Sequence, residues 1–203
     1  KEIAIDPTNP THLIISAYGG TLFESEDSGA TWRTITGNLP RNGYAPVVIS
    51  ESGDMFAGPS DRGVWRMSKG FQIWEPTGLG KATVVELWVN TNGERIYAFD
   101  ESGKLHYSVD SGTSWSTVDR HFYSVALDRL VMERIVGISD SRDILVSNDG
   151  GRNWTKTGEL SQSATYPNPQ VHVALDQKGL FYLTTGLAIM RSTDYGLSWQ
   201  ALS

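Results

Sequence analysis

One eight-residue motif recurs along this chain at near-constant intervals, and this spacing limits which folds the chain can adopt. Four copies share the order Ser, any residue, Asp, any residue, Gly, any residue, a small polar residue and Trp. They are SEDSGATW, SVDSGTSW, SNDGGRNW and STDYGLSW, and a degraded fifth copy reads MSKGFQIW. The copies end at Trp32, Trp74, Trp115, Trp154 and Trp199, in steps of 42, 41, 39 and 45 residues. A period of about 40 residues is the length of one four-stranded propeller blade.

Each period also contains four short runs of β-branched and aromatic residues, separated by Gly and Pro turn signals and without helical periodicity. We therefore predict an all-β chain, a five-bladed β-propeller of four-stranded antiparallel blades, with part of a six- or seven-bladed ring as the alternative. A length of 203 residues fits one domain, 1–203. The predicted blades are about 1–40, 41–81, 82–120, 121–162 and 163–203. In each blade the last strand is predicted to open with the motif Trp.

The repeated motif has a local physical logic as a turn between the third and fourth strands. Its Asp carboxylate can accept backbone N–H groups across the turn, and its Gly tolerates positive φ. Its Trp offers apolar area for packing between neighbouring blades, so we expect each Trp to be mostly buried. The predicted structural residues are Ser25, Asp27, Gly29, Trp32, Ser108, Asp110, Gly112, Trp115, Ser147, Asp149, Gly151, Trp154, Ser192, Asp194, Gly196 and Trp199.

At these residues the sequence resembles the Asp-box, or BNR-repeat, β-propellers. That family includes sialidases, xyloglucan-type hydrolases, sortilin-like receptors and photosystem II assembly factors, so the resemblance indicates a fold more than an activity. It implies that the box is a structural turn away from the usual binding face, rather than a calcium site. It also implies a secreted, periplasmic or cell-surface protein.

Charge and composition exclude several classes of partner. With 23 acidic and 17 basic residues the net charge is −6, which disfavours nucleic acid and anionic membrane surfaces. The chain has no cysteine, and its four histidines (His12, His106, His121 and His172) lack the spacing of a zinc site. No apolar run approaches the roughly 18 residues of a membrane span. We predict no metal, no cofactor and no membrane insertion.

A glycoside hydrolase is the enzymatic alternative. The Arg-Ile-Pro motif of sialidases is absent, so a sialidase is disfavoured. Other glycosidases need two carboxyl groups that face one cleft. The acids that do not follow the repeat are placed in loops that open on the binding face, and the candidates are Asp61, Asp100, Glu101 and Asp140. Asp6, Asp128 and Asp176 recur at the end of the first strand, which favours turn capping.

The sequence favours a non-catalytic binding or scaffold module whose loops contact a protein or a glycan. The candidate ligand-binding residues lie at turns or in segments that interrupt the repeat, and they are Tyr18, Tyr44, Arg62, Tyr166 and Asn168. The alternative is a glycoside hydrolase-like enzyme, or a fragment of one, that uses two of the loop carboxylates. An assembly factor with a large protein footprint is a third hypothesis. If five blades close into a ring we expect a monomer, and otherwise self-association.

Overall fold

The computed structural model describes residues 2–41, 43–128, 130–161, 169–174 and 177–202. Tyr166, Asn168 and Asp176 lie outside these residues. The chain divides into two compact units, Lys1–Thr117 and Val118–Ser203, and each is described by itself.

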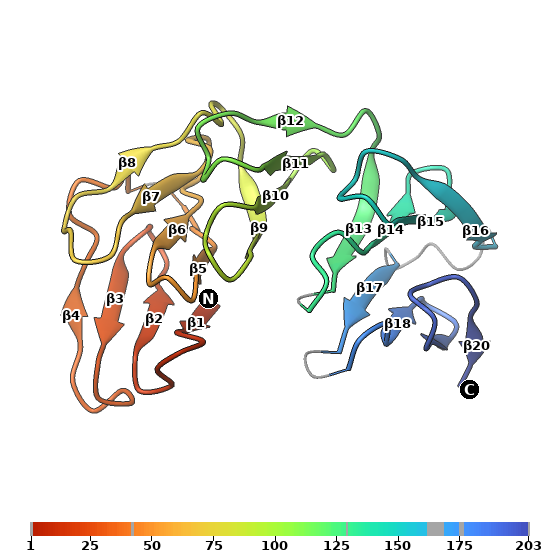
Figure 1. Ribbon diagram of the computed structural model, residues 1–203, viewed down its shortest axis with the longest axis horizontal. Helices are drawn as coiled ribbons and strands as arrows, with labels where there is room; N and C mark the ends of the chain where they lie inside the picture. The colour runs from red at the N-terminus through yellow and green to blue at the C-terminus, as the bar shows by residue number, and fades with distance from the viewer. Residues whose placement is uncertain (1, 42, 129, 162–168, 175–176, 203) are drawn as a thin grey trace. The chain divides into compact units, whose positions relative to one another are not determined.

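Five four-stranded antiparallel sheets, one for each sequence period, form a five-bladed β-propeller (Figure 1). Within each sheet the strands follow chain order, so every blade is a meander of four neighbouring strands. The described part of the chain contains no helix.

The first unit contains three blades. Blade 1 consists of β1 (Glu2–Ile5), β2 (Leu13–Ser16), β3 (Leu22–Ser25) and β4 (Arg33–Thr34). Blade 2 consists of β5 (Val47–Ile49), β6 (Met55–Ala57), β7 (Trp65–Met67) and β8 (Glu75–Pro76). Blade 3 consists of β9 (Val84–Val89), β10 (Ile96–Asp100), β11 (Leu105–Ser108) and β12 (Ser116–Thr117).

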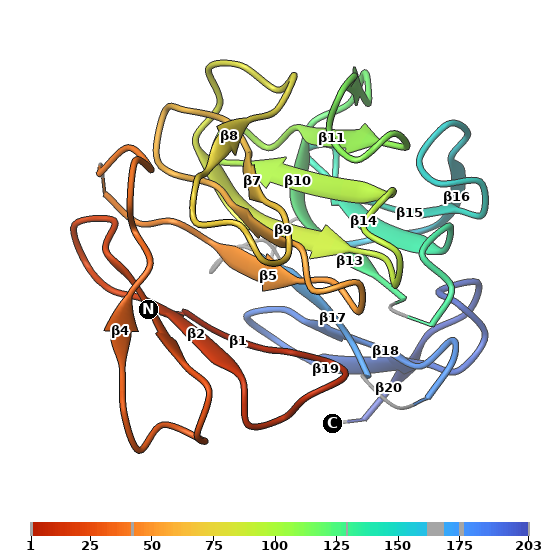
Figure 2. The same cartoon turned by 60° about the vertical axis from the view of Figure 1, so that its left-hand side comes forward.

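The second unit contains two blades. Blade 4 consists of β13 (Phe122–Leu127), β14 (Ile135–Ser139), β15 (Asp143–Ser147) and β16 (Thr155–Glu159). Blade 5 consists of β17 (Gln170–Val173), β18 (Phe181–Thr184), β19 (Ile189–Ser192) and β20 (Gln200–Ala201). Within the units, the first strands of neighbouring blades contact one another: β5 lies between β1 and β9 (Figure 2), and β13 contacts β17.

The hydrophobic core lies in layers between neighbouring sheets, as β6 shows. All three of its residues are buried, but successive side chains of a strand point to opposite faces. Met55 and Ala57 therefore join the layer shared with blade 1, and Phe56 joins the layer shared with blade 3. A corresponding layer between blades 4 and 5 is built on Phe181 and Leu183. Alternate residues of one strand thus pack into two different core layers.

The turns of each blade in the first unit lie at two opposite ends of its strands. The loop face carries the second-to-third strand turns and the connections between blades, residues 17–21, 35–41, 43–46, 58–64, 77–83 and 101–104. The box face carries the other turns, residues 6–12, 26–32, 50–54, 68–74, 90–95 and 109–115.

The fourth strands differ from their prediction in one respect. Each begins one residue after the box Trp, not with it. In the intact boxes the reason is that the indole N–H donates to the Gly carbonyl three residues earlier, which holds the Trp within the turn. The single domain, ring closure and the monomer stay predictions.

Candidate functional site

The intact boxes are compact hydrogen-bonded turns, as blade 3 shows. Ser108 Oγ donates to Asp110 Oδ1 (2.7 Å) and accepts the N–H of Gly112 (2.9 Å). Asp110 then accepts the backbone N–H of Ser114 at Oδ1 (2.9 Å) and its hydroxyl at Oδ2 (2.6 Å). The same Ser–Asp–Gly bonds recur in the other three intact boxes. Each box carboxylate is therefore saturated by its own turn.

These bonds stabilise the ionised form of the box carboxylates. The Thr31 hydroxyl and backbone N–H hold the pKa of Asp27 at about 2, and Ser114 does the same for Asp110, with a pKa of about 2. The pKa values of Asp149 and Asp194 are lowered as well.

The turn needs two consecutive residues with positive φ, where the sequence predicted one. In blade 1 these are Ser28 (60°) and Gly29 (90°). The residue before the box Gly is thus also left-handed in each intact copy, including Tyr195 (62°) in blade 5. The second position has a larger φ, between 83° and 91° at Gly29, Gly112, Gly151 and Gly196. A side chain at that φ is strained, which explains why Gly is found there.

The prediction that every box Trp is mostly buried is wrong for Trp32, which is 39% exposed. Trp115, Trp154 and Trp199 are half-buried. The physical reason is the bond from the indole N–H back to the Gly carbonyl, 2.9–3.1 Å in the four copies. The ring covers its own turn with one face and leaves part of itself in solvent.

The degraded box of blade 2 behaves differently. Lys69 and Phe71 stand where the other copies have Asp and Gly. Trp74 is only 1% exposed, and its indole N–H donates to Ile35 O in blade 1 (2.9 Å). The Asn38 side chain bonds both the N–H and the C=O of Trp74, at 2.9 and 2.8 Å. The Trp that lost its box is therefore the most buried of the five.

The loop face of the first unit brings together several residues predicted as binding or catalytic. Ser60 Oγ donates to Tyr44 O (3.1 Å), which joins the loop before blade 2 to the loop that carries Arg62. Thr83 joins two further loops: its hydroxyl accepts the N–H of Asp61 (3.2 Å), and its carbonyl accepts the N–H of Glu101 (2.9 Å).

Gly63 permits this close approach of the loops. Its N–H donates to Ala82 O at 3.0 Å, and its φ is +65°. A Cβ at this position would lie 2.0 Å from Leu79 O, so no side chain fits. The loops of blades 2 and 3 are consequently packed backbone against backbone, which gives the exposed side chains of Asp61, Arg62 and Glu101 a fixed base.

The other predicted residues are placed as follows. Tyr18 lies on the β2–β3 turn at the loop face and is 92% exposed. Asp140 is exposed in the second unit, where its N–H bonds His121 O (3.2 Å). Tyr166 and Asn168 lie outside the described residues.

The placement of Asp100 in an open loop is wrong. It is the last residue of β10 and 7% exposed. Its Oδ1 accepts bonds from Ser102 and Lys104, and its Oδ2 meets His106 Nε2 at 2.9 Å. Burial opposes ionisation, but the hydrogen bonds from His106, Ser102 and Lys104 together outweigh it and lower the pKa of Asp100. Both carboxylate oxygens are therefore occupied by hydrogen bonds within the fold. Sequence spacing does not reveal the pairing of Asp100 with His106 between neighbouring strands.

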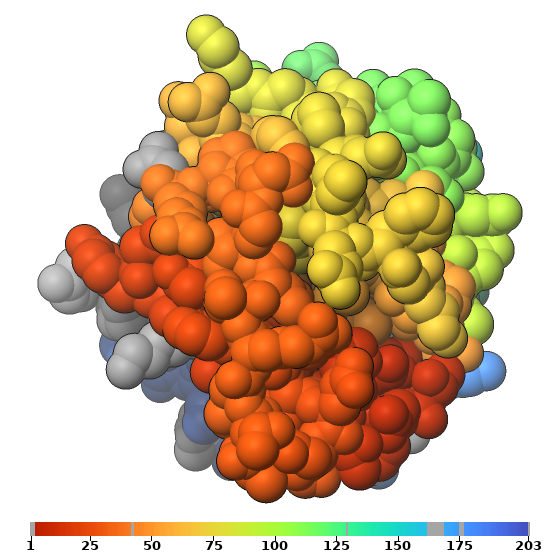
Figure 3. Space-filling model, turned by 90° about the vertical axis from the view of Figure 1, so that its left-hand side faces the viewer, coloured from red at the N-terminus to blue at the C-terminus, as the bar shows by residue number. Residues whose placement is uncertain are grey.

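A polar groove of about 570 Å3 lies on the box face between blades 1 and 2. Figure 3 looks onto this side of the unit, where the red and orange surface of blade 1 adjoins blade 2. At its blade 1 wall, His12 stands between two carboxylates, with Nδ1 2.9 Å from Asp6 and Nε2 2.8 Å from Glu24. The Arg33 guanidinium pairs with the other oxygen of Glu24.

The charges in this wall stabilise one another. Burial disfavours the imidazolium, but the hydrogen bonds to Asp6 and Glu24 outweigh it, so the pKa of His12 is raised. Burial likewise opposes ionisation of Asp6, whose pKa is nevertheless lowered by the bonds from His12 and Thr8. The spacing of Asp6, His12, Glu24 and Arg33 in the sequence does not predict this network. The available signal was the degraded box, which marks blade 2 as the place where the repeat changes.

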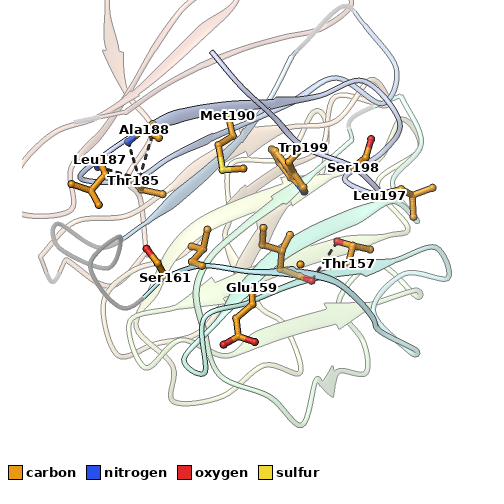
Figure 4. Close-up of a pocket in the computed structure, with 13 residues that line it drawn as sticks. Thr157, Glu159, Ser161, Thr185, Leu187, Ala188, Met190, Leu197, Ser198 and Trp199 are labelled. Atoms are coloured by element: carbon orange, nitrogen blue, oxygen red, sulfur yellow. Dashed lines mark hydrogen bonds between the residues drawn. The ribbon is translucent and has the colours of Figure 1, made fainter. Parts of the chain in front are cut away.

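A second groove, of about 540 Å3, lies between blades 4 and 5 of the second unit. Met190 and Trp199 point into it from blade 5, opposite Thr157 and Glu159 of β16 (Figure 4). Leu187 and Leu197 add exposed apolar surface. The lining suits an aliphatic or aromatic group.

Among the described residues, no group of three or more His, Asp or Glu side chains is arranged to hold a metal ion. The same part of the chain has no helix that is long and apolar enough to cross a membrane.

Known proteins resemble this chain over most of its length. A xyloglucanase of Paenibacillus sp is 26% identical over 209 residues, which cover 90% of this chain and 18% of the relative. No protein-family model matches the chain. The chain thus spans less than a fifth of the curated relative that it matches.

Solved structures give the same fold. A GH74 enzyme of Niastella koreensis superposes with a TM-score of 0.71 at 20% identity, covering 99% of this chain and 31% of that chain. A structure of YCF48 bound to D1 peptide superposes with a TM-score of 0.58 at 13% identity, covering 98% and 79%. The chain therefore has the β-propeller fold of these structures, in keeping with the BNR-repeat resemblance of its sequence.

Proposed function

We propose that this chain is a non-catalytic, glycan-binding propeller module that contacts its ligand through the loop face of blades 1–3. The observation that carries the proposal is the convergence of loops there, where Ser60 and Thr83 fix the segments that bear Tyr44, Asp61, Arg62 and Glu101. A rigid base under exposed polar side chains lowers the entropy lost on binding. A xyloglucan oligosaccharide is the first ligand to test, because the curated relative is a xyloglucanase.

The surroundings of the carboxylates support a non-catalytic role. A glycosidase needs one carboxylic acid that stays protonated near neutral pH, which desolvation in an apolar pocket provides. Asp61 and Glu101 are both exposed to solvent, and Asp100 is committed to its turn and to His106. The exposed groups of the loop face are suited to recognition.

A glycoside hydrolase, or a fragment of one, is the second candidate. Two observations favour it: the similarity to a xyloglucanase, and the anchoring of Asp61 and Glu101 to the same residue, Thr83. A protein ligand is the third, since a similar fold was solved with a peptide. A secreted, periplasmic or cell-surface location belongs to the same proposal.

Calorimetric titration with xyloglucan heptasaccharide, combined with chromatography of the products, separates these functions. We expect saturable binding without turnover, and at least a tenfold loss of affinity in Arg62→Ala and Tyr18→Ala, whose side chains are exposed. Turnover that disappears in Asp61→Asn or Glu101→Gln would establish the hydrolase instead. Absence of glycan binding, with retention of a peptide, would establish the protein-binding alternative.

A further inference from the structure

The polar groove on the box face is a consequence of the degraded box in blade 2. An intact box places Gly under its Trp ring, but blade 2 has Phe71 at that position and Trp74 turned toward blade 1. The Phe71 side chain is left 67% exposed, and with Lys69 and Gln72 it lines the groove. The loss of the repeat thus exposes an aromatic ring beside a polar wall.

Blade 2 stabilises this altered turn by other means. Asp54, from the preceding turn, accepts the N–H of Lys69 (2.9 Å) at Oδ1 and pairs with Arg66 (2.6 Å) at Oδ2. The stem of Lys69 lies on Gly53, where a Cβ would meet Lys69 Cδ at 2.7 Å. The turn that presents Phe71 is therefore held in place although its own box bonds are gone.

The opposite wall is charged but nearly balanced. Three carboxylates, of Asp6, Glu24 and Glu26, face the cations of Arg33 and Lys69 and the imidazole of His12. Asp6, Glu24, His12 and Arg33 are already paired with one another. A balanced, internally paired set of this kind attracts an ionic ligand little, because each charge that the ligand engaged would have to give up a partner.

The same lining suits hydroxyl groups, which donate and accept. Guanidinium and ammonium groups donate, carboxylates accept, and the amides of Asn9 and Gln72 do both. An exposed ring such as Phe71 can cover the apolar C–H face of a sugar. The buried Glu24 and His12 hold this surface in one arrangement, since their side chains are only 4% and 14% exposed.

From these features we infer that the box-face groove between blades 1 and 2 is a second binding site, which takes a neutral oligosaccharide with one sugar ring on Phe71. None of the loop-face residues Tyr18, Asp61, Arg62 and Glu101 lines this groove. It therefore does not depend on the function proposed for that face.

The test is a titration of ¹⁵N-labelled protein with cellotetraose and with xyloglucan heptasaccharide, followed by amide NMR. We expect saturable shifts of the amide signals of residues 69–72 with at least one of the two sugars. Phe71→Ala, which removes an exposed ring, is expected to weaken this binding at least tenfold. Gln72→Ala is a second variant that removes only hydrogen bonds, with a smaller loss.

Arg62→Ala is the matched control, because it changes an exposed side chain on the loop face. It should leave the shifts of residues 69–72 unchanged, so that failure of either site is seen separately. The inference is overturned if neither sugar shifts these signals at millimolar concentration, or if Phe71→Ala binds as the unchanged protein does. Saturation of the groove by a tetralysine peptide instead of a sugar would also overturn it.

Discussion

Blades 2 and 3 are both four-stranded meanders, but the tryptophan at the box position makes different contacts in each. In blade 3 the intact box closes on itself, and Trp115 covers its own Gly112. In blade 2 the turn depends on Asp54 from a neighbouring loop, and Trp74 is bonded 39 residues away to Ile35. An intact box is thus a local device. The degraded copy depends instead on contacts with other loops and with blade 1. Its exposed ring, Phe71, is the surface that we propose for binding.

The largest expected effect is the removal of Trp74. Because the ring is fully buried between blades 1 and 2, Trp74→Ala should lower the free energy of unfolding by about 3–5 kcal/mol. Trp115→Ala, at a half-buried ring, should cost only about 1–2 kcal/mol. Urea titration of both variants checks the contrast. Equal losses in the free energy of unfolding would show that the two rings contribute equally to stability.

Asn38 should also contribute to stability through its contacts with Trp74, but less than the Trp74 ring does. Asn38→Ala removes two hydrogen bonds that tie blade 1 to the backbone of Trp74, at a cost of about 1 kcal/mol since water can reach the site. Asn38→Asp keeps the acceptor for the Trp74 N–H and loses the donor, so it should cost less. An unchanged urea midpoint in Asn38→Ala would mean that Trp74 is held by packing alone.

Acid should weaken the intact boxes. The pKa values of Asp27 and Asp110 are about 2 in the folded protein, below the ordinary value near 3.8 of an unfolded Asp. Their contribution to stability is therefore complete above pH about 4 and is lost as the pH falls toward 2. Blade 2 has Lys69 at this position and adds nothing to this effect. Urea midpoints measured from pH 5 to 2 should fall less steeply for Asp110→Asn than for the unchanged protein.

The smallest effect is expected at Phe71. Its ring is 67% exposed, so Phe71→Ala should change the free energy of unfolding by no more than about 0.5 kcal/mol. Thermal denaturation measures this directly and validates the variant for the binding test. A loss well above about 1 kcal/mol would mean that the ring packs into the fold instead of lining the groove.

For the fold, local sequence was sufficient because each blade is a local meander with its own turn signals. The period of the box tryptophans and the alternation of apolar residues predicted the five sheets and their order. The turn itself could also be anticipated, because Ser108, Asp110 and Gly112 interact within a few residues of one another.

Contacts between strands and between loops were decided by the tertiary structure. Nothing in the spacing of Asp100 and His106 shows that the two will meet across neighbouring strands and remove Asp100 from an open loop. Nor does spacing show that Asp61 and Glu101 will both anchor on Thr83, or that His12 will stand between Asp6 and Glu24. The box pattern likewise says nothing of where Trp74 turns once its Gly is replaced. That choice depends on the space beside Ile35 and Asn38, which exists only when two sheets pack together.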